Sequence, residues 1–486
     1  MNRNCCSVTL LTALSVVCCS VLVSGCVSVG PDYRAPQLHE PDFSVQGLVA
    51  GDNATDDARQ LADWWTGFGD EMLVGFVVRA LEGSPDMRAA AARVRAARAE
   101  LGISRSGFFP KVTGSADFTR TKTGTDAGGD GYGNMYFAGF DALWEIDIFG
   151  GTRRAVEAGR ARLESEIAGL HDVWISLAAE VALTYIEIRT FQRRLQVARN
   201  NLEAQKETLE ILSSRYRTGL TDALDVSQAR YNMESTRSSI PLLNAGLENA
   251  CNALAVLTGE QPGSLHGCLE RALPIPVPPA GDVPGINADA LRRRPDIRRA
   301  ERLLAAESAR IGEAVARLYP AFSLSGFFGT QAMRSSELFT SGSGTHSLVP
   351  GVVWPVFRAG ELVGRVRAQT AVQEQYLATY EKTVLGAVAE VRDALSGYVQ
   401  ERQRIEYLQN AVVAAVEAVA IARDKYSNGL TDFNNVLDAQ RSLLSLEESL
   451  AVSRGKTSGY MVKIYKALGG GWLMSGHDST DQTAAE

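Results

Sequence analysis

Cysteine and histidine are scarce beyond the first 26 residues of this 486-residue chain. The five histidines are scattered, with no pair at the spacing of metal ligands, so a Cys/His metal site is not expected. No Ser-His-Asp elbow and no phosphate-binding loop occurs either, which argues against an enzyme and against a bound cofactor. Five of the seven cysteines lie near the amino terminus: Cys5, Cys6, Cys18, Cys19 and Cys26.

Excess positive charge is also lacking. The chain carries 49 Lys and Arg against 56 Asp and Glu, a formal net charge of -7, which disfavours nucleic-acid binding. Its only basic run, Arg292-Arg293-Arg294, is typical of a solvated helix start. Beyond the leader no run of 18 uncharged apolar residues occurs, so no transmembrane helix is expected in the mature chain. A membrane crossing would therefore require a closed β-barrel.

The first residues have the features of an export signal. Arg3 and the amino terminus supply positive charge, and Val8 to Val23 is an apolar stretch too short for a good transmembrane helix. The stretch ends in Leu22-Val23-Ser24-Gly25-Cys26, which resembles the lipobox of bacterial lipoproteins, where cleavage leaves a lipid-carrying cysteine. In enteric lipoproteins an aspartate directly after the lipidated cysteine favours retention in the inner membrane. This chain has Val27 at that position, which favours the outer membrane. The alternative is a plain secretory signal with an incidental cysteine.

An internal repeat follows, at a constant offset of 210 residues, with its anchors in the same order. No proline occurs between Pro110 and Pro241 or after Pro355, as long helices require, because proline costs about 3 kcal/mol inside a helix. Pro241 has no counterpart, so a kink is expected in the first repeat alone. The anchors are Pro85-Asp86 with Pro295-Asp296, Phe109-Pro110 with Tyr319-Pro320, Trp144 with Trp354, and Tyr216–Asp222 with Tyr426–Asp432.

Each repeat combines two period-two segments with a hairpin of long helices. The alternation of apolar and polar residues predicts strands of about ten residues, the length of a tilted membrane-spanning β-strand, although a soluble hairpin would show it too. Apolar residues at spacings of three and four then predict a helix on the order of 100 Å long, followed by a Gly turn and a returning helix. The first repeat is expected to contain a helix Asp70–Ser106, strands Lys111–Arg120 and Tyr136–Ile148, and helices Gly151–Arg217 and 221–257; the second, strands Ala321–Thr330 and Ser347–Phe357, and helices Gly360–Ser427 and Thr431–Leu468.

Four candidate spanning strands cannot close a barrel alone, because about eight are needed even to hold side chains inside. An open four-stranded sheet would leave unsatisfied edges in lipid. The chain must therefore oligomerise if the strands span a membrane. Two copies would give eight strands with a filled interior, and three would give twelve strands with room for a channel. The expected fold class is an internally duplicated α+β membrane protein.

These motifs together resemble the TolC-type outer membrane factors, specifically the OprM-like lipoprotein branch often labelled NodT. The resemblance implies a homotrimeric outer membrane lipoprotein. Its twelve-stranded β-barrel, with four strands from each chain, would be continued by a long α-helical tunnel in the periplasm. The resemblance also implies the exit duct of a tripartite efflux pump, docked to a periplasmic adaptor and an inner-membrane transporter of the RND type. The motifs that carry it are Cys26–Tyr33, Trp64-Trp65 before Phe68-Gly69-Asp70, Trp144-Glu145 with Phe149-Gly150, Leu291–Asp296 and the two Gly-Leu-Thr-Asp turns.

The resemblance also implies a gate at the periplasmic tips. Asp438 corresponds to an acidic ring residue, and Arg441 and Tyr426 to links that hold the tip shut; alternatively, Asp438 and Arg441 are an ordinary i,i+3 surface pair. Asn434 stands where the family often has an apolar constriction residue, so a second, hydrophobic constriction is not expected. The adaptor-facing residues would be Gly219, Leu220, Thr221 and Asp222 in one turn, and Gly429, Leu430, Thr431 and Asp432 in the other.

Two alternative functions are weaker. A duct for type I protein secretion would share the architecture, but the lipobox favours the efflux branch. A trimeric periplasmic structural lipoprotein would explain helices and lipid but not duplicated hairpins of spanning length. The residues leave the cargo open.

Cys251 and Cys268 could form a disulfide, because both are expected in the oxidising periplasm and are close in sequence. The expected segments are a signal peptide 1–25, a lipid-anchored irregular segment 26–66, a first repeat 67–258, a Pro-rich linker 259–286, a second repeat 287–468 and a disordered tail 469–486.

Overall fold

The chain folds into two units, each assembled from segments that are far apart in the sequence. This computed structural model describes residues 28–36, 61–123, 131–278 and 288–471. The first unit contains 93–167 and 299–381 with the segment 28–36, and the second contains 61–92, 168–298 and 382–471. Cys26, the predicted signal peptide, most of the predicted anchor segment and all but the first three residues of the predicted tail lie outside the described residues.

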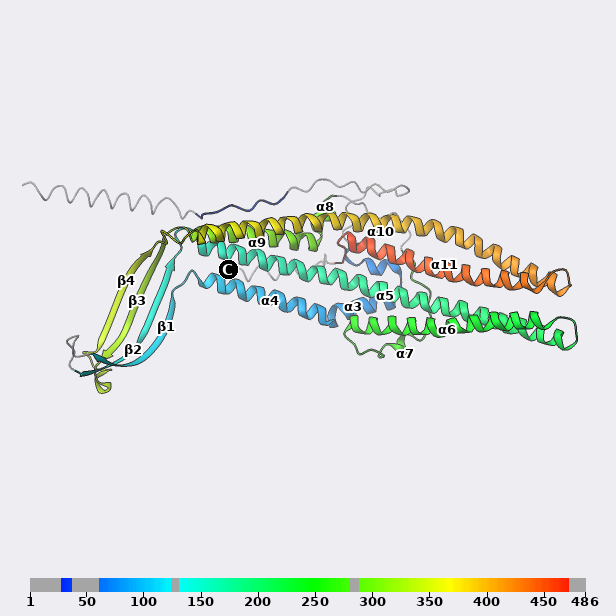
Figure 1. The fold of residues 1–486 in the computed structure, drawn as a ribbon, viewed down its shortest axis with the longest axis horizontal. Helices are drawn as coiled ribbons and strands as arrows, with labels where there is room; N and C mark the ends of the chain where they lie inside the picture. Colours follow the sequence, from blue (N-terminus) through cyan, green and yellow to red (C-terminus); the bar gives the residue numbers. More distant parts are fainter. Residues whose placement is uncertain (1–27, 37–60, 124–130, 279–287, 472–486) are drawn as a thin grey trace, which may run out of the picture. The chain divides into compact units, whose positions relative to one another are not determined.

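The first unit holds a four-stranded antiparallel sheet with the strands in chain order (Figure 1). This confirms the four predicted strands, although all four extend further at the loop end than the alternation predicted, and β2 and β4 end earlier at the helix end. Within this sheet β1 and β4 are edge strands, so each leaves a row of backbone groups without a partner in the same chain. The strands are β1 Lys111–Thr123, β2 Gly131–Ile146, β3 Ala321–Ala332 and β4 Gly344–Val353.

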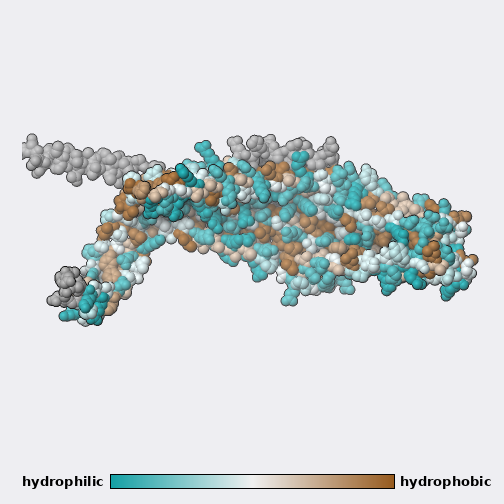
Figure 2. Space-filling view, viewed as in Figure 1, coloured by the Kyte–Doolittle hydropathy of each residue, from teal (hydrophilic) through white to brown (hydrophobic). Residues whose placement is uncertain are grey.

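The strand register places the even-numbered positions of all four strands on one face, and most of the large apolar side chains of the sheet lie at these positions. Phe140 on β2 lies opposite Gly114 on β1 and Phe328 on β3, and Phe322 on β3 lies opposite Val352 on β4. Phe140 and Phe328 are 60% and 71% exposed in the single chain. Figure 2 shows white and brown surface along the sheet and teal at its loop end. An uncovered apolar face with two open edges fits a sheet that pairs with other copies in lipid.

The helix predicted from Asp70 to Ser106 is two helices, α3 Glu71–Gly83 and α4 Pro85–Ser106. Ser84 between them is extended, with φ −60° and ψ 135°, because a residue that precedes proline is disfavoured in the helical region. Its hydroxyl accepts a hydrogen bond from the amide of Asp86. The second repeat has the same break between α8 Ala288–Arg293 and α9 Pro295–Ala316.

The four long helices are confirmed as α5 Gly151–Arg217, α6 Ala223–Thr258, α10 Glu361–Ser427 and α11 Phe433–Ala467. Helix α6 continues through Pro241, so this proline does not end it. The linker contains one short helix, α7 His266–Leu269, that the proline pattern did not predict.

The two 67-residue helices, α5 and α10, are long and apolar enough to cross a membrane by length and composition, contrary to expectation. The apolar window of α5 is 44% buried, whereas that of α10 is only 11% buried. Exposed apolar side chains along α10 include Leu385, Val413 and Val416. The buried core helices of soluble proteins are also long and apolar, so these two stretches do not show that either helix spans a membrane. The exposed apolar surface of α10 is instead available for contact with other copies of the chain.

Equivalent positions of the two repeats have equivalent structure. Trp144 Nε1 donates to Phe108 O at 2.9 Å, and Trp354 Nε1, 210 residues later, donates to Leu318 O at 3.2 Å. Gly219 and Gly429 share a φ of 74°, a left-handed conformation that favours glycine. The duplication is therefore confirmed in three dimensions.

Candidate functional site: the hairpin tips and the N-terminal clamp

Each long helix pair of the second unit ends in a tight turn (Figure 1). In the first turn, Gly219 N donates to Tyr216 O and Leu220 N to Arg215 O, which satisfies carbonyls at the end of α5. Asp222 then caps α6 by accepting from the amide of Asp225 at 3.0 Å. The second turn repeats the pattern, with Leu430 N donating to Lys425 O at 2.8 Å.

The two turns differ at the helix cap and agree at the exposed leucine. Asp432 occupies the N-cap position of α11 but its side chain makes no capping hydrogen bond. Leu220 and Leu430 are 69% and 74% exposed, so each turn presents a large apolar side chain to solvent. These two equivalent side chains form a surface on which a partner can bury apolar area.

A small apolar core joins the two hairpins near their tips. Leu212 of α5, Ala229 of α6 and Phe433 of α11 are each at most 3% exposed within it. Val436 and Leu437 complete the cluster. The exposed positions Asn434 and Asp438 of the same helix are four residues apart and therefore share its other face.

Tyr426 connects the end of α10 to the first tip. Its hydroxyl lies 3.2 Å from Thr221 Oγ1 and donates to Asp225 Oδ2 at 3.4 Å. Its ring packs on Phe433, with centroids 5.3 Å apart, and the Arg215 guanidinium lies 5.1 Å above it. Tyr426 therefore touches both hairpins.

Arg441 makes the corresponding link from α11 to α6. Its Nε donates to Asn232 Oδ1 at 2.9 Å, and its guanidinium lies 5.4 Å from the ring of Tyr231. A second guanidinium nitrogen lies 3.8 Å from Asp438 Oδ1, a long ion pair to a side chain that is 75% exposed. Arg441 thus holds the neighbouring helix more firmly than it holds Asp438.

Buried amides surround this link. Asn232, Gln205 and Gln440 are at most 4% exposed, and they lie on α6, α5 and α11 respectively. Asn232 Nδ2, both polar atoms of the Gln205 amide, and Gln440 Oε1 have no hydrogen-bond partner among the described residues. The hairpins therefore meet partly through polar groups whose bonds are incomplete.

A second site, in the first unit, holds the segment 28–36. We call it the N-terminal clamp; it consists of Arg154 with Glu157, Phe149, Gly150 and Gly312. The buried Arg154 donates to the carbonyl of Val29 and pairs with Asp32 at 2.7 Å and Glu157 at 2.8 Å. Burial alone would lower the pKa of Arg154, but these two carboxylates outweigh burial and raise it, so the clamp stays cationic.

Backbone contacts complete this clamp. Val29 N donates to Phe149 O at 3.1 Å. Gly30 has a φ of 93°, and a Cβ there would overlap the backbone of Gly312. Only glycine fits this close approach. Ser28 lies against Gly150, which directly precedes α5. The segment after Cys26 is therefore fixed beside the junction of β2 and α5.

Arg294 organises the end of the second repeat. It is only 6% exposed, pairs with Asp296 and Glu390 at 2.8 Å each, and donates to Ala467 O at 2.9 Å. The two carboxylates raise its pKa despite a burial effect of opposite sign. The basic run was expected to be a solvated helix start, and that is wrong for Arg294.

The disulfide between Cys251 and Cys268 does not form in the structure, which leaves both thiols free. Cys251 is buried in the second unit, and burial raises the pKa of its thiol. Cys268 is exposed, and its Sγ donates to Leu265 O in its own turn. The two side chains therefore occupy different surroundings. In the part of the chain that the structure describes, no group of three His, Cys, Asp or Glu side chains could hold a metal ion.

The structure brings Asp438, Arg441 and Tyr426 close to one end of the hairpins, with both Gly-Leu-Thr-Asp segments at the turns (Figure 1). No pattern in the sequence indicated Asn232 and Asp225 as partners of these residues, and none indicated Arg154. The repeat offset contained part of the signal, because Arg441 contacts Tyr231, its equivalent 210 positions earlier. Nothing in the spacing indicated Arg154.

The chain matches the family model described as outer membrane efflux protein twice, over residues 76–260 and 287–470. It is 30% identical over 401 residues to nodulation protein T of Rhizobium leguminosarum bv. trifolii, an alignment that covers 82% of this chain and 84% of the relative. It is 28% identical over 398 residues to the probable outer membrane lipoprotein SilC of Salmonella typhimurium, covering 79% and 83%. Among solved structures, the outer-membrane channel OprN matches with a TM-score of 0.83 and 36% identity, over 92% of this chain and 99% of that one.

Proposed function

Because the chain belongs to the outer membrane efflux protein family, it is the outer membrane exit channel of an efflux pump, and we propose that its hairpin tips form the gate. The channel is a homotrimer, in which three copies of the sheet close a twelve-stranded barrel continued by a periplasmic helical tunnel. It works with a periplasmic adaptor and an inner-membrane RND transporter. The family consists of channel proteins, and we propose that conduction here is passive, without catalysis.

The gate proposal rests on the position and exposure of Asp438. Three copies of this carboxylate around a threefold axis repel one another, so a closed tip needs nearby positive charge. Arg441 supplies it in each copy, 3.8 Å away, while its stronger bond to Asn232 anchors the α10–α11 hairpin to the α5–α6 hairpin. The resting state proposed here is closed, with Arg441 and Tyr426 as the two links between hairpins.

Conductance of single trimers in planar bilayers tests the gate. Arg441→Ala removes a link and leaves the Oδ1 atom of the buried Asn232 without a hydrogen-bond partner among the described residues, a cost of about 1–3 kcal/mol. We therefore expect a several-fold higher open probability. Asp438→Ala should reduce cation selectivity. Arg237→Ala is the matched control, since it breaks an exposed i,i+3 pair with Glu234 on α6 and should change neither property. Conductance and selectivity unchanged in both gate variants would reduce Asp438 and Arg441 to a surface pair.

We further propose that the adaptor docks on the two Gly-Leu-Thr-Asp turns and shifts a closed–open equilibrium. The support is the pair of exposed leucines at equivalent positions. Leu220→Ser with Leu430→Ser should lower adaptor affinity at least tenfold, because six apolar contacts per trimer disappear. Binding measured by interferometry with the adaptor encoded beside this gene checks it, and Leu242→Ser, 75% exposed on α6 away from the turn, is the control. Equal losses in both variants would contradict tip docking.

The lipid-anchor proposal joins the lipobox to the Arg154 clamp. Cys26 is two residues from Ser28, so no more than about 7 Å of extended backbone separates its Cα from that of a residue held against Gly150. Gly150 lies between the end of β2 at Ile146 and the start of α5 at Gly151, at the boundary between the sheet and the helices. Acyl chains on Cys26 would therefore enter the leaflet that surrounds this rim of the barrel.

A further inference from the structure

The two repeats meet inside one chain at an aromatic contact, where the sheet joins the helices of the first unit. Phe149, in the linker between β2 and α5, stacks on Tyr319 with ring centroids 4.7 Å apart, and it lies 6.5 Å from the ring of Phe322 on β3. The contact follows from the strand order, because β2 of the first repeat pairs with β3 of the second. Aromatic pairs add about 0.5–1.5 kcal/mol beyond the area they bury, so this contact helps to hold the two repeats together.

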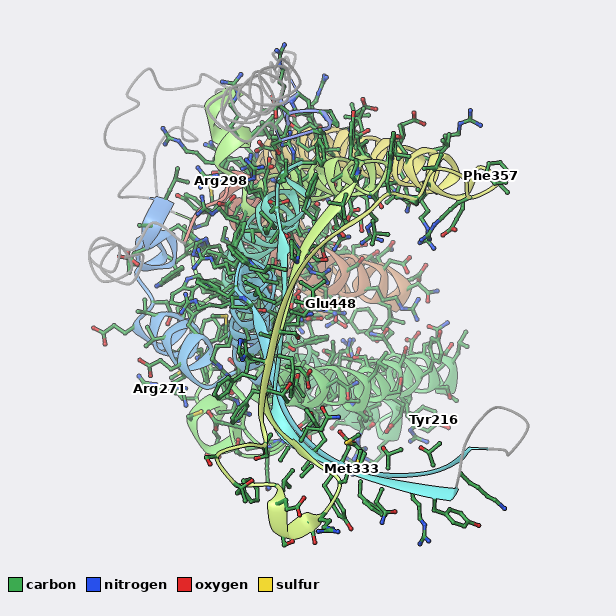
Figure 3. The ribbon with its side chains drawn as sticks, turned by 90° about the vertical axis from the view of Figure 1, so that its left-hand side faces the viewer. Tyr216, Arg271, Arg298, Met333, Phe357 and Glu448 are labelled. Carbon is green, nitrogen blue, oxygen red and sulfur yellow. The ribbon has the colours of Figure 1, made fainter. Side chains whose placement is uncertain are left out.

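The corresponding aromatic residues at the two open edges of the sheet are exposed in the single chain. Phe109, just before β1 and 210 positions before Tyr319, is 68% exposed. Phe357 follows Phe149 by 208 positions, in the equivalent linker between β4 and α10, and is 86% exposed. It points outward in Figure 3, whereas Phe149 is half-buried. Each edge therefore presents one half of a contact that the chain completes in its middle.

The helices beside these linkers show the same difference. Inside the chain α5 packs on α9, where Ala161 and Ala306 are buried in one cluster. Their counterparts 210 positions away are Ala371 on α10 and Ala96 on α4, and both are exposed. One copy of this helix contact is therefore made within the chain, and the other lacks its second half.

The contact between α5 and α9 also supplies a register for the missing one. Arg154 of α5 lies against Gly312 of α9. Shifted by 210 positions, the same register sets Gly364 of α10 opposite Gly102 of α4, and both glycines border open space in the single chain. The residues next to these two glycines are exposed and apolar. They are Val363 on α10, 47% exposed, and Ile103 on α4, 72% exposed.

A second copy of the chain is the partner that fits both edges. In the homotrimer, β4 of one copy runs beside β1 of the next, because the sheets of three copies close one barrel. β4 ends and β1 begins at the helix end of the sheet, so the linker after β4 reaches the residues that precede β1 of the next copy. A head-to-tail contact of this kind closes a ring when each copy repeats it.

We propose that each contact between copies at the junction of barrel and tunnel repeats the contact between the two repeats of one chain. Phe357 packs on Phe109 of the next copy, as Phe149 packs on Tyr319. Helix α10 packs on α4 of that copy, as α5 packs on α9. The duplication thus supplies the subunit interface as well as the chain fold, and the ring at this level alternates between contacts within chains and contacts between them.

Oxidation of paired cysteines in the assembled trimer tests this contact. In a Cys251→Ala, Cys268→Ala background, Phe357→Cys together with Phe109→Cys should link one chain to the next. Each chain then offers one thiol at each edge, so a denaturing gel without reductant should show two-chain and three-chain products. Gel filtration before oxidation confirms that the variant is a trimer.

Phe357→Cys with Tyr319→Cys is the matched control. Tyr319 directly precedes β3, the neighbour of β4 in the same chain, so a link to it reports Phe357 turned toward its own chain. We expect the pair with Phe109→Cys to link at least ten times faster than this control. Phe149→Cys with Tyr319→Cys should link within one chain, without any product of higher mass.

Val363→Cys with Ile103→Cys keeps the test decisive if loss of the aromatic rings weakens the trimer, because it leaves both rings in place. This pair should give the same two-chain and three-chain products. Products of one-chain mass alone from both edge pairs, or equal rates with Phe109→Cys and Tyr319→Cys, would overturn the proposal. A two-chain product from Phe357→Cys alone would also overturn it, because the linkers of two copies would then face each other.

Discussion

Replacing Cys26 by serine should abolish lipid labelling and signal cleavage together. The thiol is the only group in the lipobox that accepts the diacylglycerol, and a serine hydroxyl is a much weaker nucleophile. We expect no incorporation of radiolabelled palmitate and a chain that retains residues 1–25. Intact mass and autoradiography of membrane fractions measure both effects.

Cys19→Ser is the matched control, because it changes a cysteine of the same leader outside the lipobox. This variant should be labelled and cleaved like the parent. Normal processing of Cys26→Ser would refute the lipoprotein assignment. The clamp around Arg154 would then hold the start of an unmodified chain.

Arg294→Ala should cause a large loss of stability. The side chain is 6% exposed and joins two carboxylates to the carbonyl that ends α11, so its loss leaves Asp296 partly buried without its cation. Removing one partner of a fully buried ion pair typically costs about 3–5 kcal/mol. Because the carboxylates of Asp296 and Glu390 are 29% and 59% exposed, solvent screens part of this interaction, and the expected loss lies at or below the lower end of that range. The urea midpoint of the trimer in detergent should fall accordingly.

Arg293→Ala makes the same charge change one residue earlier at an exposed position, and should stay within about 0.5 kcal/mol of the parent. Arg294→Lys should recover part of the loss, because an ammonium keeps the charge but cannot match the forked geometry. Similar midpoints for Arg293→Ala and Arg294→Ala would show that the buried network adds little.

The long helices and the strands were predictable because their signals are local and periodic. A gap of about 130 residues without proline, apolar positions three and four apart, and alternation over ten residues each correspond to one type of backbone. The turns at Gly219 and Gly429 were predictable for the same reason, since a left-handed residue after a helix favours glycine. The break at Ser84 was missed although Pro85 signals it, because the alanine-rich sequence around it favours helix.

The site was only partly predictable, because its contacts join segments that are remote in sequence. In the sequence, Asn232 cannot be told from any other polar residue of a helix. Its role depends on Arg441, 209 positions later, which donates a hydrogen bond to it in the fold. Arg154 is one of many arginines, and only the fold shows that it is buried against a segment more than 120 residues away. Figure 3 shows the opposite case in Phe357, a large aromatic side chain that points outward and is 86% exposed, which no rule of core formation explains within one chain.

The buried amides near the tips have a consequence for how the channel can be regulated. An interface made only of apolar side chains would lose its whole contact energy when the helices separate, which would favour the closed state strongly. Asn232, Gln205 and Gln440 instead hold donors and acceptors that gain water when the helices separate, which offsets part of that loss by about 1–3 kcal/mol for each group. If the tips form the gate, as proposed, this offset narrows the free-energy gap between the closed and the open tip. Reversing a 1:99 population requires about 5.5 kcal/mol of preferential binding, so an adaptor that binds the open tip by that margin would open it without unfolding the helices.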